Sequence, residues 1–233
     1  MTKELTKEDL KKIIFDAFKD VPKGNGCGVR ECAAEDDYAS EEDKEKAREQ
    51  DIEQHWWEYP KELIESNNLD YALSYNNKDG IKFHLPALMT ADIDRFGNIT
   101  EVSIFSTLCL DNFEKKPHHG YREYVGFMKS IDISKIIKYY NFTREQTHAI
   151  ALYFLFDVSI NKSHQFFDNR EDMISLTKRI HEQCEKYSGK ENYNLTPEDA
   201  IAIVDEEHRI MRDWFKIGDV DVDNYVFVDN AGQ

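Results

Sequence analysis

The sequence has little of several features that mark large classes of protein. Its four cysteines are scattered over 233 residues and form no C-x-x-C pair, which argues against a zinc-finger module or a disulfide-rich secreted domain. It holds only five prolines, and no repeat or low-complexity linker interrupts the chain. We therefore expect reduced thiols in a cytoplasmic protein, while a redox pair between Cys27 and Cys32 stays an open alternative.

Long apolar runs are also missing. The longest, residues 149–156, has eight residues, whereas a membrane-spanning helix needs about 20. Residues 1–12 are charged and amphipathic and contain no apolar segment of the kind found in signal peptides. The sequence therefore predicts neither membrane insertion nor secretion.

Positive charge is in short supply as well. The chain has 30 Lys and Arg against 46 Asp and Glu, for a net charge of −16, which argues against direct binding of nucleic acid or of an anionic membrane. The acidic excess is concentrated, because residues 31–53 hold eleven acids and three bases and so carry half of the net charge. Such a block attracts cations or basic proteins.

The chain contains enough apolar material for a sizeable core, with 40% hydrophobic and 12% aromatic residues. Helix N-cap patterns recur, such as Thr6 with Asp9, and apolar residues then follow at helical spacing. We predict a mainly α fold, an irregular multi-helix bundle with a short extended element at residues 220–228. Its predicted core comprises Ile14, Phe18, Trp56, Leu63, Leu88, Ile104, Phe105, Leu108, Ile150, Leu152, Phe154 and Leu155.

The stretch at residues 159–169 is the best candidate for a domain boundary. It would divide a helical body, residues 1–158, from a C-terminal helical extension with an acidic tail, residues 159–233. Residues 197–215 of that extension are predicted to form a helix, because Thr196 and Pro197 are typical of a helix start and acids follow in the first turn.

Three short motifs stand out in the first half of the chain. The first is G-x-G-x-G-x-x-E at residues 24–31, followed by D-x-Y-A at residues 36–39; the second is D-x-x-x-x-W at residues 51–56; the third is G-x-K-F-H-L-P-A-L at residues 80–88. Together they resemble a family of uncharacterised bacterial proteins of unknown function, in which an Arg is usual at Lys82. The resemblance covers about residues 10–158 and implies a mostly helical fold, but no activity.

Few patterns in the chain point to metal or anion chemistry. The glycine-rich loop could cradle an anion through its backbone N–H groups, but the acidic segment that follows would repel phosphate, so we favour a structural loop. His118 with His119, and His181 with Cys184, lack the third and fourth ligands that a metal site needs. Residues 219–230 begin like a calcium loop but lack its glycine and final glutamate. We predict no metal and no cofactor.

The acidic block carries the leading functional hypothesis. We predict a binding protein of the immunity or antitoxin type, which neutralises a basic bacterial effector such as a nuclease by presenting carboxylates to its cationic cleft. The predicted contact residues are Asp36, Asp37, Glu41, Glu42, Asp43, Glu45 and Trp57, with Asp219, Asp221 and Asp223 as a second patch.

Two other functional classes stay open. An enzyme would use Glu31, Asp37 and His84 as an acid/base site at the glycine-rich loop, and these side chains would then converge in one pocket. A structural or regulatory subunit would instead present an apolar patch on its C-terminal helices. The candidate residues of that patch are Ile203, Ile210, Met211, Trp214 and Phe215.

Overall fold

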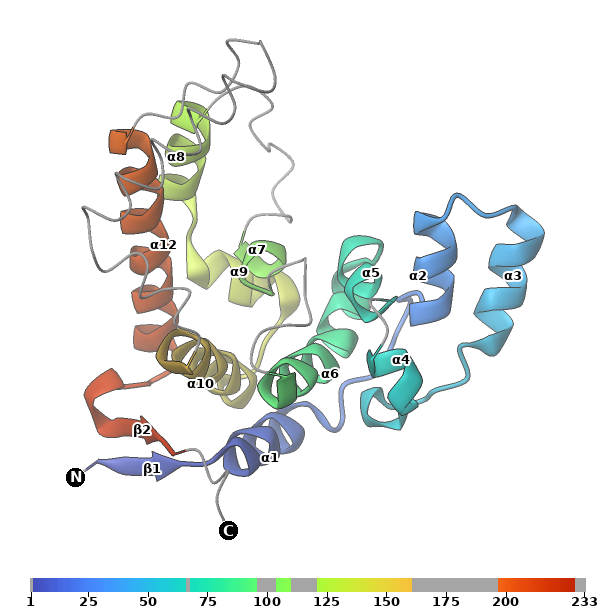
Figure 1. Cartoon of the computed structure of the whole chain (residues 1–233), viewed down its shortest axis with the longest axis horizontal. Coiled ribbons are helices and arrows are strands. Elements are labelled where there is room, and N and C mark those ends of the chain that lie inside the picture. The colour runs from blue at the N-terminus through green and yellow to red at the C-terminus, as the bar shows by residue number, and fades with distance from the viewer. Residues whose placement is uncertain (1, 66–67, 96–103, 110–120, 161–196, 229–233) are drawn as a thin grey trace.

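A computed structural model describes residues 2–65, 68–95, 104–109, 121–160 and 197–228 (Figure 1). The fold is mainly α, as predicted. Its helices are α1 (Lys7–Phe18), α2 (Val29–Asp36), α3 (Glu41–Gln50), α4 (Lys61–Glu65), α5 (Asn68–Ser74), α6 (Lys78–Arg95), α7 (Ile104–Cys109), α8 (Tyr121–Ser130), α9 (Ile133–Tyr140), α10 (Arg144–Ile160) and α12 (Pro197–Ile217). Two 3₁₀ turns, η1 (Trp56–Glu58) and η3 (Val222–Asn224), and two strands, β1 (Lys3–Leu5) and β2 (Tyr225–Phe227), complete it.

The helices follow one another through space as a series of packed neighbours. In order, α8 packs on α12, α12 on α10, α10 on α1, α1 on α6, α6 on α5, α5 on α2, and α2 on α3. Helices α8 and α12 therefore stand at one end of the molecule and α2 and α3 at the other (Figure 1). We call the last two the α2–α3 hairpin, residues 29–50.

Helix starts lie where the cap patterns predict them. Thr6 Oγ1 accepts a hydrogen bond from the Asp9 N–H at 3.1 Å, and the Asp9 carboxylate accepts one from the Thr6 N–H at 3.0 Å. Helix α3 begins in the same way, because Ser40 Oγ accepts from the Asp43 N–H at 3.2 Å. Such side chains satisfy backbone donors that the first turn leaves unpaired.

Helix α6 begins earlier than expected. The segment from Asn76 to Gly80 is predicted as a turn, with a helix start or a kink near Pro86, but a single helix runs from Lys78 to Arg95. Asn77 Oδ1 accepts hydrogen bonds from the N–H groups of Asp79 and Gly80 at 3.0 and 3.1 Å. This cap starts the helix before the proline is reached.

The core runs through the middle of the series and into α12. Every predicted core residue whose side chain is described is buried. The side chain of Phe105 lies outside the described part of the structure. Of the five predicted patch residues, Ile210, Met211 and Trp214 belong to the same core, and the Trp214 Nε1–H donates to Cys109 Sγ at 3.5 Å. Helix α12 is thus part of the body's packing, while residues 161–196, which include most of the predicted boundary, lie outside the described residues.

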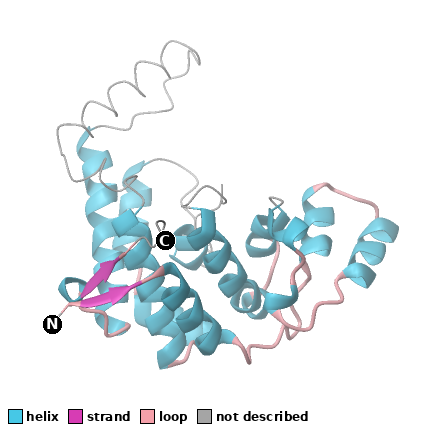
Figure 2. Ribbon diagram, turned by 60° about the horizontal axis from the view of Figure 1, so that its bottom comes forward, coloured by secondary structure: helices cyan, strands magenta, loops and turns pink. Residues whose placement is uncertain are grey.

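The two strands form a small parallel sheet that joins the ends of the described chain. Lys3 pairs with Tyr225 and Leu5 with Phe227, and both strands lie beside the helical body (Figure 2). Of the extended element predicted at residues 220–228, residues 225–227 form a strand, whereas residues 222–224 form the turn η3. The partner strand β1 was not predicted. Within the described part of the chain, no helix is long and apolar enough to cross a membrane.

Candidate functional site

The glycine-rich loop packs against the segment that leads into α6. The Cys27 N–H donates to Asn76 Oδ1 at 2.8 Å, and Asn76 Nδ2 donates to the Cys27 carbonyl at 3.0 Å. A Cβ on Gly26 would lie 2.4 Å from the Cα of Gly80, so both positions exclude a side chain. The N–H groups of Gly26 and Cys27 are therefore engaged in internal contacts, which favours a structural role for the loop over anion binding.

The start of α2 is capped by a residue from beyond α3. Asp51 accepts hydrogen bonds from the N–H groups of Arg30 at 3.0 Å and Glu31 at 2.9 Å. A carboxylate at this position also opposes the positive end of the helix dipole. Gly28 leaves room for it, since a Cβ there would lie 2.1 Å from Asp51 Cγ. The cap ties the first residue after α3 to the first turn of α2.

Three acids of the acidic block point inward. Glu31, Asp51 and Glu53 are each less than a tenth exposed, and each faces an arginine. Arg30 Nη1 lies 3.2 Å from Asp51 Oδ1 and 3.0 Å from Glu53 Oε1, while Arg48 Nε donates to Glu31 Oε1 at 2.8 Å. These pairs compensate the cost of burying the carboxylates, and they join α2 to α3 and to the segment that follows α3.

His84 is enclosed and both of its ring nitrogens are engaged. Nε2 lies 2.9 Å from the Cys27 carbonyl, which can only accept, so Nε2 carries the proton. Nδ1 then accepts from the Tyr59 hydroxyl at 2.7 Å. Burial lowers the pKa of His84 to about 4, so the ring is neutral near pH 7.

The predicted acid/base site is not assembled. Asp37 follows the last residue of α2 and is exposed, Glu31 faces Arg48, and His84 has no nitrogen left for a substrate. Burial also raises the pKa of the Cys27 thiol, and Glu31 beside it raises it further, so this cysteine is a poor nucleophile.

Helix α3 carries five of the eight other acids of the block and has no buried residue. Two of the block's three bases are engaged with acids of α2, since Lys44 Nζ contacts Glu35 at 2.8 Å and Arg48 contacts Glu31. Lys44 also contacts Glu41 at 3.2 Å, and Lys46 contacts Glu42 and Asp43. The outer acids nevertheless outnumber these bases; they are Asp36, Asp37, Glu41, Glu42, Asp43, Glu45 and Glu49.

The predicted contact residues differ in what else they do. Asp36 is half-buried and accepts from the Tyr75 hydroxyl at 2.8 Å, and Asp43 accepts from the Ser40 hydroxyl at 2.7 Å. In the second predicted patch, Asp219 pairs with Arg144 at 3.1 Å. That patch follows α12, at the opposite end of the molecule from α3 (Figure 1), so the two acidic patches cannot form one surface.

The two adjacent tryptophans point in different directions. Trp56 is buried, and its Nε1–H donates to the Phe18 carbonyl at 3.1 Å. Trp57 is 39% exposed and stacks on His55, with ring centroids 4.3 Å apart. This agrees with the expectation that one of the pair packs inside and the other is available at the surface.

Sequence reasoning missed a polar cavity of about 620 Å³. It lies among α1, α6 and the start of α10, and its lining includes Asp16, Asp79, Lys82 and Glu145. Lys82 Nζ donates to the Asn141 carbonyl at 2.6 Å, and partial burial lowers the pKa of this lysine. No motif marks the cavity, because its walls come from three separate segments.

No described group of three or more His, Cys, Asp or Glu side chains could hold a metal ion. The histidine and cysteine pairs weighed from the sequence, His118 with His119 and His181 with Cys184, lie outside the described residues.

Fold and site together define a helical protein whose acidic helix pair stands at one end of a packed body. Residues 6–179 match DUF6714, a family of unknown function, and the chain belongs to this family. The match continues past residue 158, where the resemblance was expected to end. No curated protein and no solved structure matches the chain.

Proposed function

We propose that this protein is a cytoplasmic binding protein that recognises a basic protein partner through the α2–α3 hairpin. The single observation that supports it is the orientation of charge in residues 31–53. Arg48 engages Glu31 of α2, and Lys44 bridges Glu35 of α2 and Glu41 of α3, whereas the acids of α3 are all exposed to solvent. In its narrower form the proposal names an immunity or antitoxin-type protein, with an effector such as a nuclease as the partner.

The arrangement suits fast and specific association. Glu42, Glu45 and Glu49 follow one another at intervals of three and four residues, so they share one face of α3. A row of carboxylates resembles the charge pattern of a phosphate backbone, which the cleft of a nuclease attracts. Such a field accelerates encounter with a cationic surface, and the acceleration falls as salt screens it.

The test replaces Glu41, Glu42, Glu45 and Glu49 with glutamine. These four are exposed, and none caps a helix, so Asp43 keeps its bond to Ser40 and α3 is retained. The matched control carries the same change of net charge elsewhere, at exposed residues of other elements. Its substitutions are Glu4→Gln, Glu8→Gln, Glu62→Gln and Asp205→Asn.

Partners captured from cells of the source species at low salt are identified, and the purified partner is titrated with each variant. We expect a basic protein whose affinity falls at least tenfold with the α3 variant and is unchanged with the control. Its salt dependence should also weaken with the α3 variant alone. Equal binding by both variants would overturn the proposal, and a partner with nuclease or other toxic activity would support its narrower form.

A further inference from the structure

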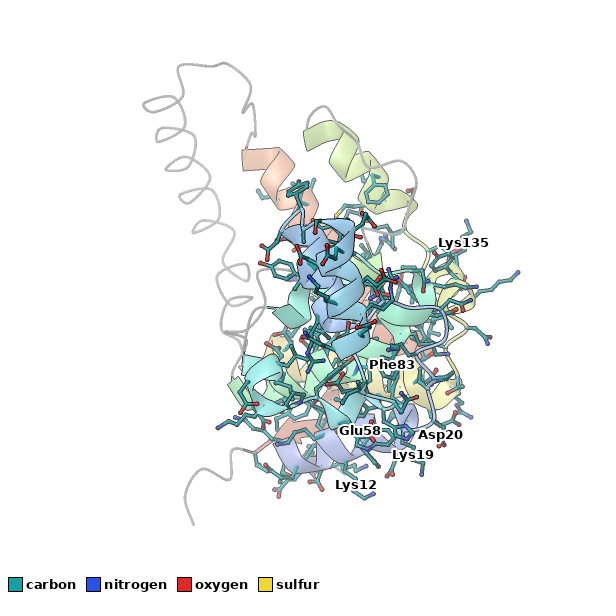
Figure 3. The ribbon with its side chains drawn as sticks, turned by 90° about the vertical axis from the view of Figure 1, so that its right-hand side faces the viewer. Lys12, Lys19, Asp20, Glu58, Phe83 and Lys135 are labelled. Carbon is teal, nitrogen blue, oxygen red and sulfur yellow. The ribbon has the colours of Figure 1, made fainter. Side chains whose placement is uncertain are left out.

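A groove of about 480 Å³ is lined by residues of α1, η1, α4 and α6. Phe15, Trp56, Trp57 and Ile64 supply most of its apolar wall, and Lys11 and Lys12 also line it. Five residues, 51–55, link the end of α3 to η1, which holds both tryptophans. Figure 3 turns this side of the molecule toward the reader, with Lys12 and Glu58 below α3.

The aromatic wall of the groove is held rigidly. The indole of Trp56 is anchored on the Phe18 carbonyl, and the ring of Trp57 is braced by Phe15, with centroids 5.1 Å apart. Glu58 fixes the turn that carries them, because its carboxylate accepts from the backbone N–H groups of Gln54 at 2.8 Å and His55 at 3.0 Å. A pre-ordered surface loses little entropy when a partner binds.

Apolar area is left open at this wall. Phe15 is 38% exposed and Trp57 39% exposed, while Ile52 in the linking segment is 73% exposed. Large aromatic side chains in partly enclosed pockets are the residues that contribute most to protein–protein binding. The groove is therefore suited to one buried side chain of a partner.

Charge decides which kind of side chain fits. Lys11 contacts Asp94 at 2.6 Å, and Lys12 contacts Asp16 at 2.6 Å, so the lysines that line the groove are already paired. A partner's cation would meet these ammonium groups in the groove, whereas on α3 it would meet a helix whose five exposed acids outnumber its three bases. An apolar group is thus favoured in the groove and a basic group on α3.

The two surfaces are close enough for one partner segment. An extended chain spans at most about 3.5 Å per residue, so Trp57 lies within about 25 Å of the end of α3. That span is within the width of an ordinary protein–protein interface.

We propose that the groove binds an apolar anchor side chain, leucine or phenylalanine, from the same basic segment whose lysines or arginines contact α3. This rests on the proposed function and adds the chemistry of the partner: a basic stretch joined directly to a large apolar residue. Trp57 and Phe15 give specificity, whereas the acids of α3 give long-range attraction.

The test uses two synthetic helical peptides and the full chain. Both peptides carry one block of lysines; the first has two leucines beside the block, and the second has alanines in their place. Binding is followed by fluorescence anisotropy of the labelled peptides. We expect the leucine peptide to bind wild type about tenfold more tightly or better, which is what burial of one leucine supplies.

The variants separate the two surfaces. Trp57→Ala should abolish the preference for the leucine peptide and leave binding of the alanine peptide unchanged. Trp57→Phe should retain most of the preference. The control Tyr139→Ala, which changes an exposed aromatic residue on α9, should alter the binding of neither peptide. Phe15→Ala serves as a second groove variant should Trp57→Ala unfold. Equal binding of both peptides to wild type, or equal weakening of both by the groove variants, would overturn the inference.

The α3 glutamine variant reports on the proposed function alone. It should weaken both peptides equally and reduce their salt dependence. If it weakens neither while the leucine preference persists, the role of α3 fails and so does the joint site. If it weakens both and no leucine preference exists, the groove fails and the acidic surface stands.

Discussion

At the scale of single residues, the histidine of the motif at residues 80–88 has a structural role, because it is completely buried. His84 fills the space between Tyr59 and the Cys27 carbonyl, and its two hydrogen bonds hold the glycine-rich loop against α6 and η1. A neutral imidazole is required, because Nδ1 must accept the Tyr59 hydrogen. His84 therefore stabilises the fold by remaining uncharged.

This makes the free energy of unfolding depend on pH. The pKa of His84 is lowered to about 4 in the folded state, against about 6.5 in an unfolded chain. The unfolded chain therefore takes up the proton first as pH falls below about 6.5, and the protein loses roughly 2–3 kcal/mol of stability between that pH and about pH 4.5. Urea unfolding of wild type and of His84→Gln, at about pH 7 and at about pH 4.5, tests this. The variant should be less stable at pH 7 and show a shallower loss; parallel losses would contradict the assignment.

A second residue-scale prediction compares two glycines. Alanine at Gly28 places a Cβ 2.1 Å from Asp51 Cγ, whereas Gly126 on α8 has nothing within 4 Å of that position. Gly28→Ala should lower the free energy of unfolding by about 1–3 kcal/mol through overpacking. Gly126→Ala should raise it by up to about 1 kcal/mol, since alanine favours a helix. Chemical denaturation measures both, and shifts of the same sign would argue against the steric explanation.

Sequence reasoning succeeded at this scale only where local contacts decide. It predicted the buried Trp56 and the exposed Trp57, but it counted the eleven acids of residues 31–53 as one charged block and did not predict which of them are buried. Glu31, Asp51 and Glu53 turn inward because Arg30 and Arg48 meet them from α2 and α3. Which way an acid points depends on its partner's place in space, and a composition count does not contain that information.

At the scale of elements, the α2–α3 hairpin depends on one remote cap. Asp51→Ala removes the acceptor of the Arg30 and Glu31 N–H groups and leaves Arg30 with Glu53 as its remaining acid. We expect a loss of about 2 kcal/mol and faster amide hydrogen exchange in residues 29–36 than in α10. Ser40→Ala, which removes the local cap of α3, is the control and should affect only residues 41–50. Uniformly faster exchange throughout the protein would contradict a local role.

Helix starts were predictable where the cap is adjacent in sequence. Thr6 and Ser40 each cap a donor three residues ahead, so the pattern is visible in the sequence. The start of α6 was missed because a helix beginning at Lys78 must contain both Gly80 and Pro86, which normally indicate a break. The partner of Asp51 is some twenty residues away, as the separations of 21 and 20 positions show, so no local pattern could reveal it.

At the scale of the whole molecule, a substitution in α12 tests whether this helix unfolds together with the rest of the body. Trp214 is fully buried among residues of the body, including Phe154, whose ring centroid lies 5.8 Å from its own. Trp214→Ala should therefore lower the free energy of unfolding by about 3–5 kcal/mol in one transition shared by all probes. Far-ultraviolet circular dichroism and tryptophan fluorescence should report the same midpoint. A second, separate transition would instead indicate an independent C-terminal extension.

The mainly α class followed from the sequence because helical periodicity and capping are local. The order in which the helices pack did not, since it depends on contacts such as Cys109 with Trp214 that join distant segments. For the same reason the cavity at Lys82 and the groove at Trp57 emerged only from the structure.

The pairing of β1 with β2 has a consequence for the way the protein is made. Leu5 is synthesised well before Val228, whose N–H donates to the Leu5 carbonyl at 3.0 Å. Through that interval Leu5, which is 2% exposed in the finished fold, has no strand beside it. Strand β1 therefore cannot complete its packing until β2 has been synthesised, although it precedes every helix in the described chain.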